Sequence, residues 1–126
     1  MSKQIINSTE APAPIGPYSQ AVQHGNTLYV SGQIALDAKS GQLVGGTIQE
    51  ETHQVMKNLK AILAAANMDF NHVVKCSIFV KDLGNFVAIN EVYGQYFISN
   101  PPARETVEVS RLPKDVQVEI SCIAVV

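Results

Sequence analysis

The sequence predicts an α+β domain in which two helices cover one face of a mixed β-sheet of about six strands. The first observation is length, because a chain of 126 residues can bury one core but is too short for two ordinary domains. The second is the order of periodic segments, which reads β-β-β-α-β-α-β-β. The third is that two helices cannot cover both faces of so wide a sheet, which favours two layers. Residues 1–126 are therefore expected to form one domain.

The N-terminal third predicts three strands and a rigid loop. Residues 3–7 suit a short edge strand, whereas three prolines in residues 11–18 remove backbone donors and exclude a helix. Residues 19–24 and 27–31 are separated by a Gly-Asn turn and predict a hairpin. Gly32 is expected to end or bulge the second strand of that hairpin.

The first helix is expected to begin at Thr47, after a turn at residues 39–41. Thr47 and Glu50 have the spacing of a capping box. Apolar residues then recur at steps of three and four and form one stripe, namely Val55, Leu59, Ile62, Leu63 and Ala66. Such a stripe predicts a helix that packs against a sheet.

The second half predicts a strand, a shorter helix and two further strands. Residues 73–80 are rich in β-branched and aromatic side chains, as a buried strand requires. Phe86, Ile89, Tyr93 and Phe97 are spaced for one face of a helix, which must end before the prolines at 101–102. Residues 106–110 and 117–126 read as strands. One face of the resulting sheet has no helix to cover it, which predicts self-association.

Composition excludes several classes of protein. Nine basic and eleven acidic residues give a net charge of -2, so no overall positive field would attract nucleic acid. No apolar run approaches the roughly 20 residues of a membrane span, and the first residues do not resemble a secretion signal, so a cytoplasmic location is expected. Cys76 and Cys122 lie inside apolar runs and are expected to be buried, reduced thiols.

The most specific motifs for cofactors are absent. The sequence contains no phosphate-binding glycine loop, no Cys-x-x-Cys, no His-Glu-x-x-His and no Gly-x-Ser-x-Gly. His24, His53 and His72 have no metal-ligand spacing between them. No metal and no cofactor are therefore expected.

Two charged residues are candidates for chemistry. Arg104 follows a proline pair at the start of a strand, where its planar guanidinium could hold a carboxylate through two hydrogen bonds. Glu119 alternates with Val118 and Ile120 and so faces away from the core, where a carboxylate could orient and deprotonate a water. A surface ion pair for Arg104 and simple exposure for Glu119 remain the alternatives.

Tyr18, Ser31 and Gly32 are weaker candidates because each also suits an ordinary packing or turn role. All three lie at the ends of predicted elements. Gly32 could let a ligand approach the backbone, although ending a strand explains a glycine equally well.

Several segments together resemble the RidA family, also called YjgF, of reactive-intermediate deaminases. They occur in the family's order and span essentially the whole chain: Ala13–Gln20, Ser31–Ile34, Phe79–Leu83, Asn90–Tyr93, Pro102–Val109, Leu112–Asp115 and Val118–Ile120. The number of separate motifs makes the resemblance more specific than any single residue.

The resemblance implies a chorismate-mutase-like fold, assembled as a homotrimer with a central β-barrel and pockets between subunits. It also implies hydrolytic deamination of 2-aminoacrylate, 2-aminocrotonate and their imine tautomers to 2-oxo acids and ammonia, without a cofactor. Pyridoxal-phosphate enzymes such as threonine dehydratase release these compounds. The implied role is metabolite damage control linked to isoleucine biosynthesis.

By the same resemblance, Arg104 binds the substrate carboxylate and Glu119 positions the attacking water. Tyr18, Ser31, Gly32 and Asn90 are implied to shape the pocket, together with Thr106. The chain departs from the family after Arg104, because Glu105 and Thr106 stand where serine and cysteine are usual. Strand alternation predicts that Glu105 points to the other face of the sheet.

Two other functions remain open. The same carboxylate-binding pocket could serve a ligand-sensing regulator of isoleucine or purine metabolism. A ribonuclease, an activity attributed to some relatives, is disfavoured because the sequence has no basic stripe and no aromatic platform.

Overall fold

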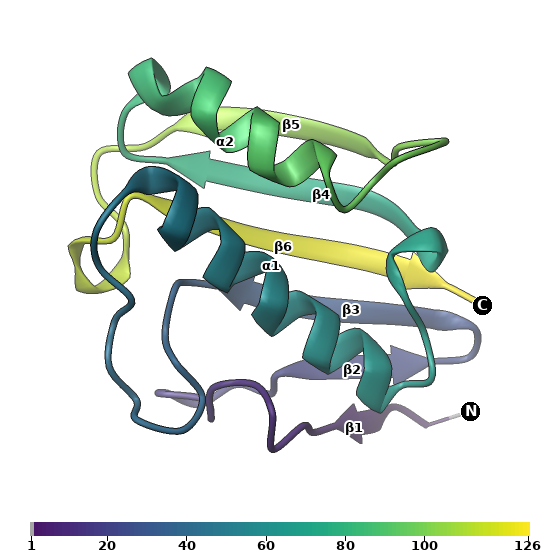
Figure 1. The fold of residues 1–126 in the computed structure, drawn as a ribbon. Helices are drawn as coiled ribbons and strands as arrows, with labels where there is room; N and C mark the ends of the chain where they lie inside the picture. The colour runs from purple at the N-terminus through teal and green to yellow at the C-terminus, as the bar shows by residue number, and fades with distance from the viewer. Residues whose placement is uncertain (1) are drawn as a thin grey trace.

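The computed structural model describes residues 2–126 and has two layers, a six-stranded sheet and a pair of helices (Figure 1). The helices are α1 (Ile48–Ala65) and α2 (Phe86–Gly94), and both lie on the same face of the sheet. The strands are β1 (Gln4–Ile6), β2 (Ala21–His24), β3 (Thr27–Gln33), β4 (Val73–Val80), β5 (Ala103–Glu108) and β6 (Val118–Val125). Short 3-10 helices occupy Phe70–His72, Leu83–Asn85 and Pro113–Asp115. The predicted order of elements and the α+β class are confirmed.

The topology explains why one face stays bare. The strand order is β1-β2-β3-β6-β4-β5, with β4 and β5 parallel and the other neighbours antiparallel. Helices α1 and α2 connect β3 to β4 and β4 to β5, so both crossovers step in the same direction along the sheet. Crossovers of one hand and one direction place their helices on one face. The sheet is open in this chain, with β1 and β5 at its edges.

The core lies between α1 and the sheet. Within the predicted stripe Val55, Leu59, Ile62 and Leu63 are fully buried, and Ala66 packs against them. Asn58 is buried beside this stripe and donates from Nδ2 to the carbonyls of Ile34 (3.1 Å) and Leu36 (3.0 Å). This amide joins α1 to the chain segment that leaves β3.

Two residues at the start of α1 accept backbone hydrogen bonds. The Thr47 hydroxyl accepts from the Glu50 amide at 3.1 Å, which confirms the helix start and one of the two bonds of the predicted capping box. The reciprocal bond from the Thr47 amide to the Glu50 side chain is not formed among residues 2–126. Glu51 Oε2 accepts from the amides of Gln117 (2.8 Å) and Val118 (3.1 Å), where β6 begins. The sequence showed Glu51 only as a polar residue beside the apolar stripe.

The predicted boundaries differ from the structure in the second half of the chain. Helix α2 ends at Gly94, so Phe97 lies beyond it and not on its face. The chain continues in tight turns, with Tyr96 and Phe97 amides bonded to carbonyls three residues earlier, and this keeps Phe97 over Tyr93 (ring centroids 4.8 Å apart). Strand β5 begins at Ala103, three residues before the predicted start, because its parallel pairing with β4 overrides local propensity.

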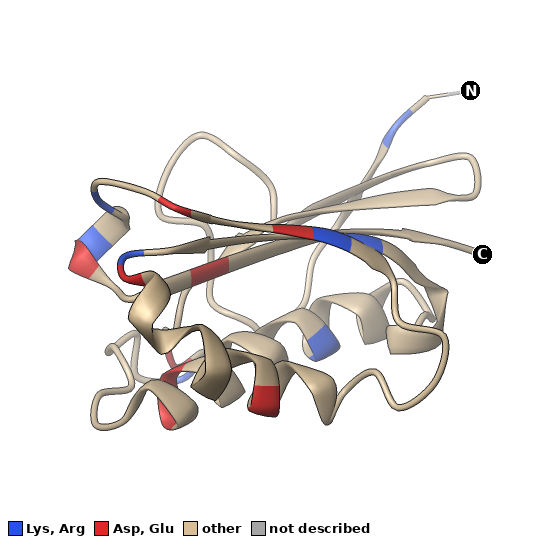
Figure 2. Ribbon diagram, turned by 90° about the horizontal axis from the view of Figure 1, so that it is seen from above, with Lys and Arg blue, Asp and Glu red and all other residues tan. Residues whose placement is uncertain are grey.

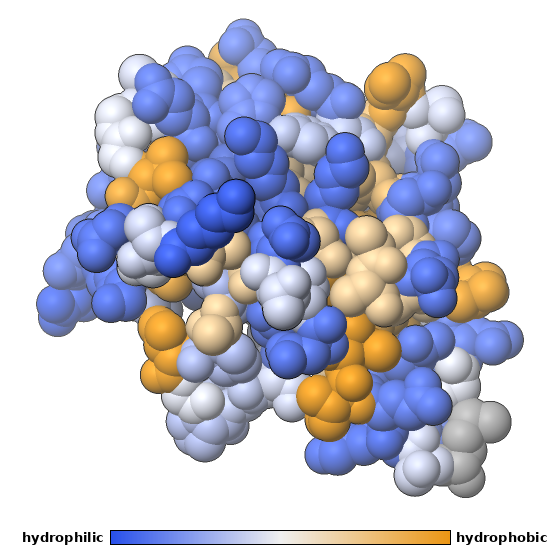
Figure 3. All heavy atoms as spheres, turned by 60° about the horizontal axis from the view of Figure 1, so that its bottom comes forward, coloured by the Kyte–Doolittle hydropathy of each residue, from blue (hydrophilic) through white to orange (hydrophobic). Residues whose placement is uncertain are grey.

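Figure 3 shows the side of the molecule where β1 and the loops 7–20 and 34–47 lie, with apolar residues at the surface among hydrophilic ones. Ile15 and Leu43 are among the exposed large apolar residues of these loops. Within residues 2–126, no helix is long and apolar enough to cross a membrane.

Candidate active site

A cavity of about 380 Å³ lies between the proline-rich loop and the adjoining ends of β3 and β6. Apolar and polar residues line this cavity: Pro12, Ala13, Ile15, Tyr18, Gln20, Ser31, Gly32, Gln33, Ile34, Leu36, Pro113 and Glu119. Four of the predicted site residues therefore meet here, namely Tyr18, Ser31, Gly32 and Glu119. Nothing in their sequence spacing indicated that they would share one cavity.

The absence of a side chain at Gly32 allows the close approach of Glu119. A Cβ atom added at Gly32 would lie 2.6 Å from Oε2 of Glu119 and 2.9 Å from its Cδ, well inside contact distance. Gly32 lies at an irregularity in the pairing of β3 with β6, between the register positions of Val30 and Gln33. The missing side chain makes room for the carboxylate, a reason that neither predicted role of this glycine included.

Glu119 combines a place in the cavity wall with a raised pKa. Its side chain is half-buried on β6, and burial raises the pKa of its carboxyl above the usual 4.5. A carboxylate with a raised pKa is a better proton acceptor, because basicity rises with the pKa of the conjugate acid.

The loop that closes the cavity is held by hydrogen bonds. Gln20 is buried, and its Nε2 donates to the carbonyls of Ser8 (3.0 Å) and Pro12 (2.9 Å). The Ser31 hydroxyl donates to the Ser19 carbonyl at 2.6 Å, so it tethers the loop while its oxygen can still accept. The Tyr18 hydroxyl accepts from the Ile15 amide at 3.2 Å. Sequence reasoning missed Gln20, whose only signal was an amide at the start of a strand.

Arg104 lies in a different environment, between β5 and helix α2. Its Cζ is 5.0 Å from the centroid of the Tyr93 ring and 5.6 Å from that of Phe86. Among residues 2–126 the guanidinium has neither an ion-pair partner nor a hydrogen bond. The predicted alternative of a surface ion pair is therefore wrong, and the donors of Arg104 are available to an external carboxylate.

Thr106 and Asn90 accompany Arg104. Thr106 follows two residues later on β5 and thus shares its face, and its Oγ1 is buried without a hydrogen-bond partner among residues 2–126. Asn90 lies on α2, partly buried, four residues after Phe86 and three before Tyr93, so these three share one side of the helix. Arg104 and Thr106 on β5 and Asn90 on α2 make up the second group of candidate residues, none of which lines the cavity.

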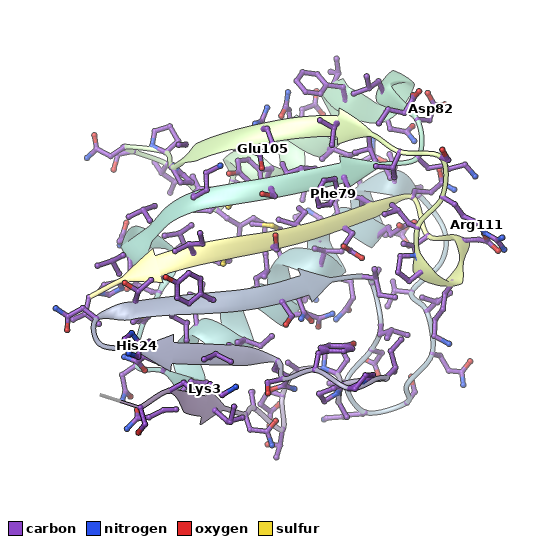
Figure 4. The ribbon with its side chains drawn as sticks, turned by 180° about the vertical axis from the view of Figure 1, so that it is seen from behind. Lys3, His24, Phe79, Asp82, Glu105 and Arg111 are labelled. Carbon is purple, nitrogen blue, oxygen red and sulfur yellow. The ribbon has the colours of Figure 1, made fainter. Side chains whose placement is uncertain are left out.

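The two groups lie on opposite faces of the sheet. Arg104 is the register partner of Cys76, which is buried on the helix side. Glu119 is the register partner of Phe79, and the odd number of steps between Cys76 and Phe79 reverses the face. Figure 4 looks onto the face of Phe79, with the helices behind the sheet. One chain thus presents two groups of candidate residues on opposite faces of the sheet.

Glu105 belongs to neither group of candidate residues. Its Oε1 is 2.9 Å from Lys75 Nζ, and its Oε2 accepts a hydrogen bond from the Ser77 hydroxyl. The side chain points to the face away from the helices, as predicted (Figure 4). The Ser77 hydrogen bond and the Lys75 ammonium lower the pKa of this carboxyl. An exposed ion pair of this kind contributes little to stability.

No group of three or more His, Cys, Asp or Glu side chains within residues 2–126 could hold a metal ion. Cys76 and Cys122 are register partners on β4 and β6, and both are free and buried as predicted. Burial raises the pKa of each thiol, which keeps them neutral and unreactive.

The chain is similar in sequence and structure to several known proteins over nearly its whole length. Residues 8–126 match the family described as Endoribonuclease L-PSP. A mouse protein named 2-iminobutanoate/2-iminopropanoate deaminase is 50% identical over 123 residues, which cover 98% of this chain and 91% of the mouse protein. The crystal structure of RidA from an Antarctic Psychrobacter species has a TM-score of 0.94 at 41% identity, covering 98% of this chain and 99% of that one. The E. coli TdcF structure with bound serine has a TM-score of 0.94 at 40% identity, covering 98% of each chain.

Proposed function

This chain belongs to the RidA/YjgF family, whose members match the Endoribonuclease L-PSP description, and from that premise we propose that it deaminates small 2-imino acids. Its substrates are 2-aminoacrylate, 2-aminocrotonate and their imine tautomers, and its products are 2-oxo acids and ammonia. It works in the cytoplasm without a metal or cofactor and limits damage by reactive intermediates, including those formed on the way to isoleucine.

The observation that carries this proposal is the state of Arg104. A partly buried guanidinium without a carboxylate or hydrogen-bond partner among residues 2–126 is a site prepared for an acid from outside the chain. Serine in the E. coli relative carries a carboxylate and an amino group on one carbon, as an imino acid carries a carboxylate and an imine. The half-buried Glu119 carboxylate supports the choice of hydrolysis, since it can activate water.

The proposed reaction is hydrolysis of a protonated imine. Arg104 and the Thr106 hydroxyl hold the substrate carboxylate, and Glu119 removes a proton from a water as its oxygen bonds to the imine carbon. Glu119 then delivers that proton to the nitrogen of the resulting carbinolamine. Ammonia leaves as the carbinolamine hydroxyl gives its proton to the Glu119 carboxylate and the carbonyl forms. The iminium carbon is already electrophilic, so orientation and a base suffice.

We further propose that the complete pocket forms between chains of a homotrimer. Arg104, Thr106 and Asn90 face one way and Glu119, Gly32, Ser31 and Tyr18 the other, so a second copy must supply the missing half. The helix-free sheet faces then line a central β-barrel and remove that surface from water. Light scattering should give about three times the 13.6 kDa chain mass.

The test couples this protein to purified threonine dehydratase and follows the conversion of the released enamine to 2-oxobutanoate. The wild type should accelerate this step. Arg104→Ala should lower the acceleration about 100-fold, because it removes two charge-assisted hydrogen bonds from the guanidinium to the substrate carboxylate. Glu119→Ala should lower it about 100-fold to 10,000-fold, the usual contribution of a general base.

Two matched controls distinguish an effect of the site residues from the effect of removing any charged side chain. Arg111→Ala removes an arginine that pairs with Asp115 in an exposed turn, and Glu91→Ala removes an exposed glutamate of α2. Both should keep wild-type acceleration. No acceleration by the wild type, together with binding of a 2-oxo acid that depends on Arg104, would instead identify the ligand-sensing regulator.

The family description also names an endoribonuclease, which the charge distribution disfavours. Figure 2 shows the Lys and Arg positions of residues 2–126 scattered over several elements, not aligned as a stripe. RNA cleavage that survives purification and vanishes in Arg104→Ala would contradict this assignment.

A further inference from the structure

We propose that Tyr93 and Phe86 are positioning residues that hold the Arg104 guanidinium through cation–π contacts, an arrangement called here the aromatic cradle. The inference rests on the proposed role of Arg104 as the carboxylate clamp. It concerns what orients this side chain, for which the chain supplies no acidic partner among residues 2–126.

The contacts are those of a cation over two ring faces. Arg104 Cζ lies 5.0 Å from the Tyr93 centroid and 5.6 Å from the Phe86 centroid, both within the range of about 6 Å at which cation–π attraction acts. Arg104 enters from β5 and both rings enter from α2, so the contact joins the edge strand to the helix above it.

The Tyr93 ring is itself held rigidly. It is 5% exposed and packs on Phe97, with ring centroids 4.8 Å apart, and Phe97 packs in turn on Phe70 at 5.2 Å. Burial raises the pKa of the Tyr93 hydroxyl far above its usual value, so the ring is a neutral phenol at all relevant pH. A fixed neutral ring provides an electron-rich face without forming an ion pair.

The consequence for function is that the N–H donors of Arg104 make no hydrogen bond to residues 2–126. A glutamate or aspartate in place of the rings would orient the guanidinium equally well but would occupy its N–H groups and compete with the substrate. Two aromatic faces hold the plane of the cation and leave its donor edge for an external carboxylate.

The experiment compares Tyr93→Leu and Phe86→Leu with Tyr93→Phe, which keeps the ring and removes only the hydroxyl. Tyr96→Leu is the matched control, because Tyr96 packs on Phe70 in the same cluster and makes no cation–π contact with Arg104. The first readout is the NMR signal of Arg104 Nε–H, which the ring current should displace from that of Arg111. Arg104 and Arg111 are the arginines of this chain, so Arg111 serves as the internal reference.

Tyr93→Leu and Phe86→Leu should move the Arg104 signal toward that of Arg111 and weaken 2-oxobutanoate binding about threefold to tenfold. In the coupled assay KM should rise more than kcat falls. Tyr93→Phe and Tyr96→Leu should keep the wild-type signal and affinity. Phe86 is 36% exposed, so Phe86→Leu should fold even if Tyr93→Leu does not.

An unchanged Arg104 signal and unchanged affinity in Phe86→Leu and in folded Tyr93→Leu would overturn the cradle. Failure of the proposed deaminase function gives a different result, because the wild type then shows no turnover while the Arg104 signal still depends on the two rings. A loss of affinity equal in Tyr96→Leu and Tyr93→Leu would mean general destabilisation and would also overturn the proposal.

Discussion

At the scale of single residues, Gly32 and Glu119 lie close together in the candidate site. Their proximity depends on the absence of a Cβ atom at Gly32, because the Glu119 carboxylate fills that space. The displaced group would be the far end of a flexible side chain, so a larger residue can be accommodated by moving the carboxylate. Stability and activity should therefore respond differently to a change at this position.

Gly32→Ala should lower the deaminase rate about tenfold to 100-fold, because an error of about 1 Å in a catalytic group has that effect. Thermal unfolding should change little, since Glu119 can rotate away. Gly45→Ala is the control, because a Cβ there would meet nothing within 4 Å. Full activity in Gly32→Ala, measured by the coupled assay, would mean that the position of Glu119 is unimportant.

The raised pKa of Glu119 predicts a pH dependence of stability. Burial penalises the charged form, so the native state loses stability as pH rises from the usual 4.5 to the raised native value. Glu119→Gln should thus unfold at a higher temperature than the wild type at neutral pH. The two should converge below pH 4.5, where the carboxyl is protonated in both states. Melting curves across this range test the sign, and a wild type that is the more stable at neutral pH would contradict it.

At the scale of elements, the N-terminal turn of α1 supports the site from a distance. The Glu51 carboxylate accepts hydrogen bonds from the backbone amides of Gln117 and Val118 at the start of β6. Glu119 is the next residue on that strand. The helix thereby fixes where β6 begins, in addition to covering the core with its apolar stripe.

Glu51→Ala should lower the free energy of unfolding by about 1–3 kcal/mol, because the amides of Gln117 and Val118 lose a charged acceptor. Urea unfolding measures this difference. Glu50→Ala changes the preceding, exposed glutamate and should have an effect within about 0.5 kcal/mol. Equal effects of the two substitutions would show that the bonds of Glu51 contribute nothing specific.

At the scale of the whole molecule, the proposed pocket needs two copies of the chain, because Arg104 and Glu119 lie on opposite faces of the sheet. A closed ring of like subunits satisfies both halves of every chain, since each interface joins one face to the other. A single chain would leave Arg104 and Glu119 separated by the sheet itself.

Mixed oligomers of Arg104→Ala and Glu119→Ala should recover activity that neither variant has alone. With random assembly in equal amounts, about one quarter of the pockets combine an intact Arg104 with an intact Glu119. The two variants are unfolded together, refolded and assayed, and the same variants mixed without unfolding are the control. Mixed oligomers without activity would mean that each chain builds its own pocket.

The sequence by itself determined the order of elements, the Thr47 cap, the buried stripe of α1 and the opposite orientations of Glu105 and Arg104. These follow from contacts within a turn of helix or from alternation along one strand, which any short window of sequence contains. The tertiary structure alone decided that Glu119 fills the space beside Gly32, that Glu51 bonds the start of β6 and that Arg104 rests on aromatic rings. Those contacts depend on strand register and helix placement, which bring together residues that no local pattern relates.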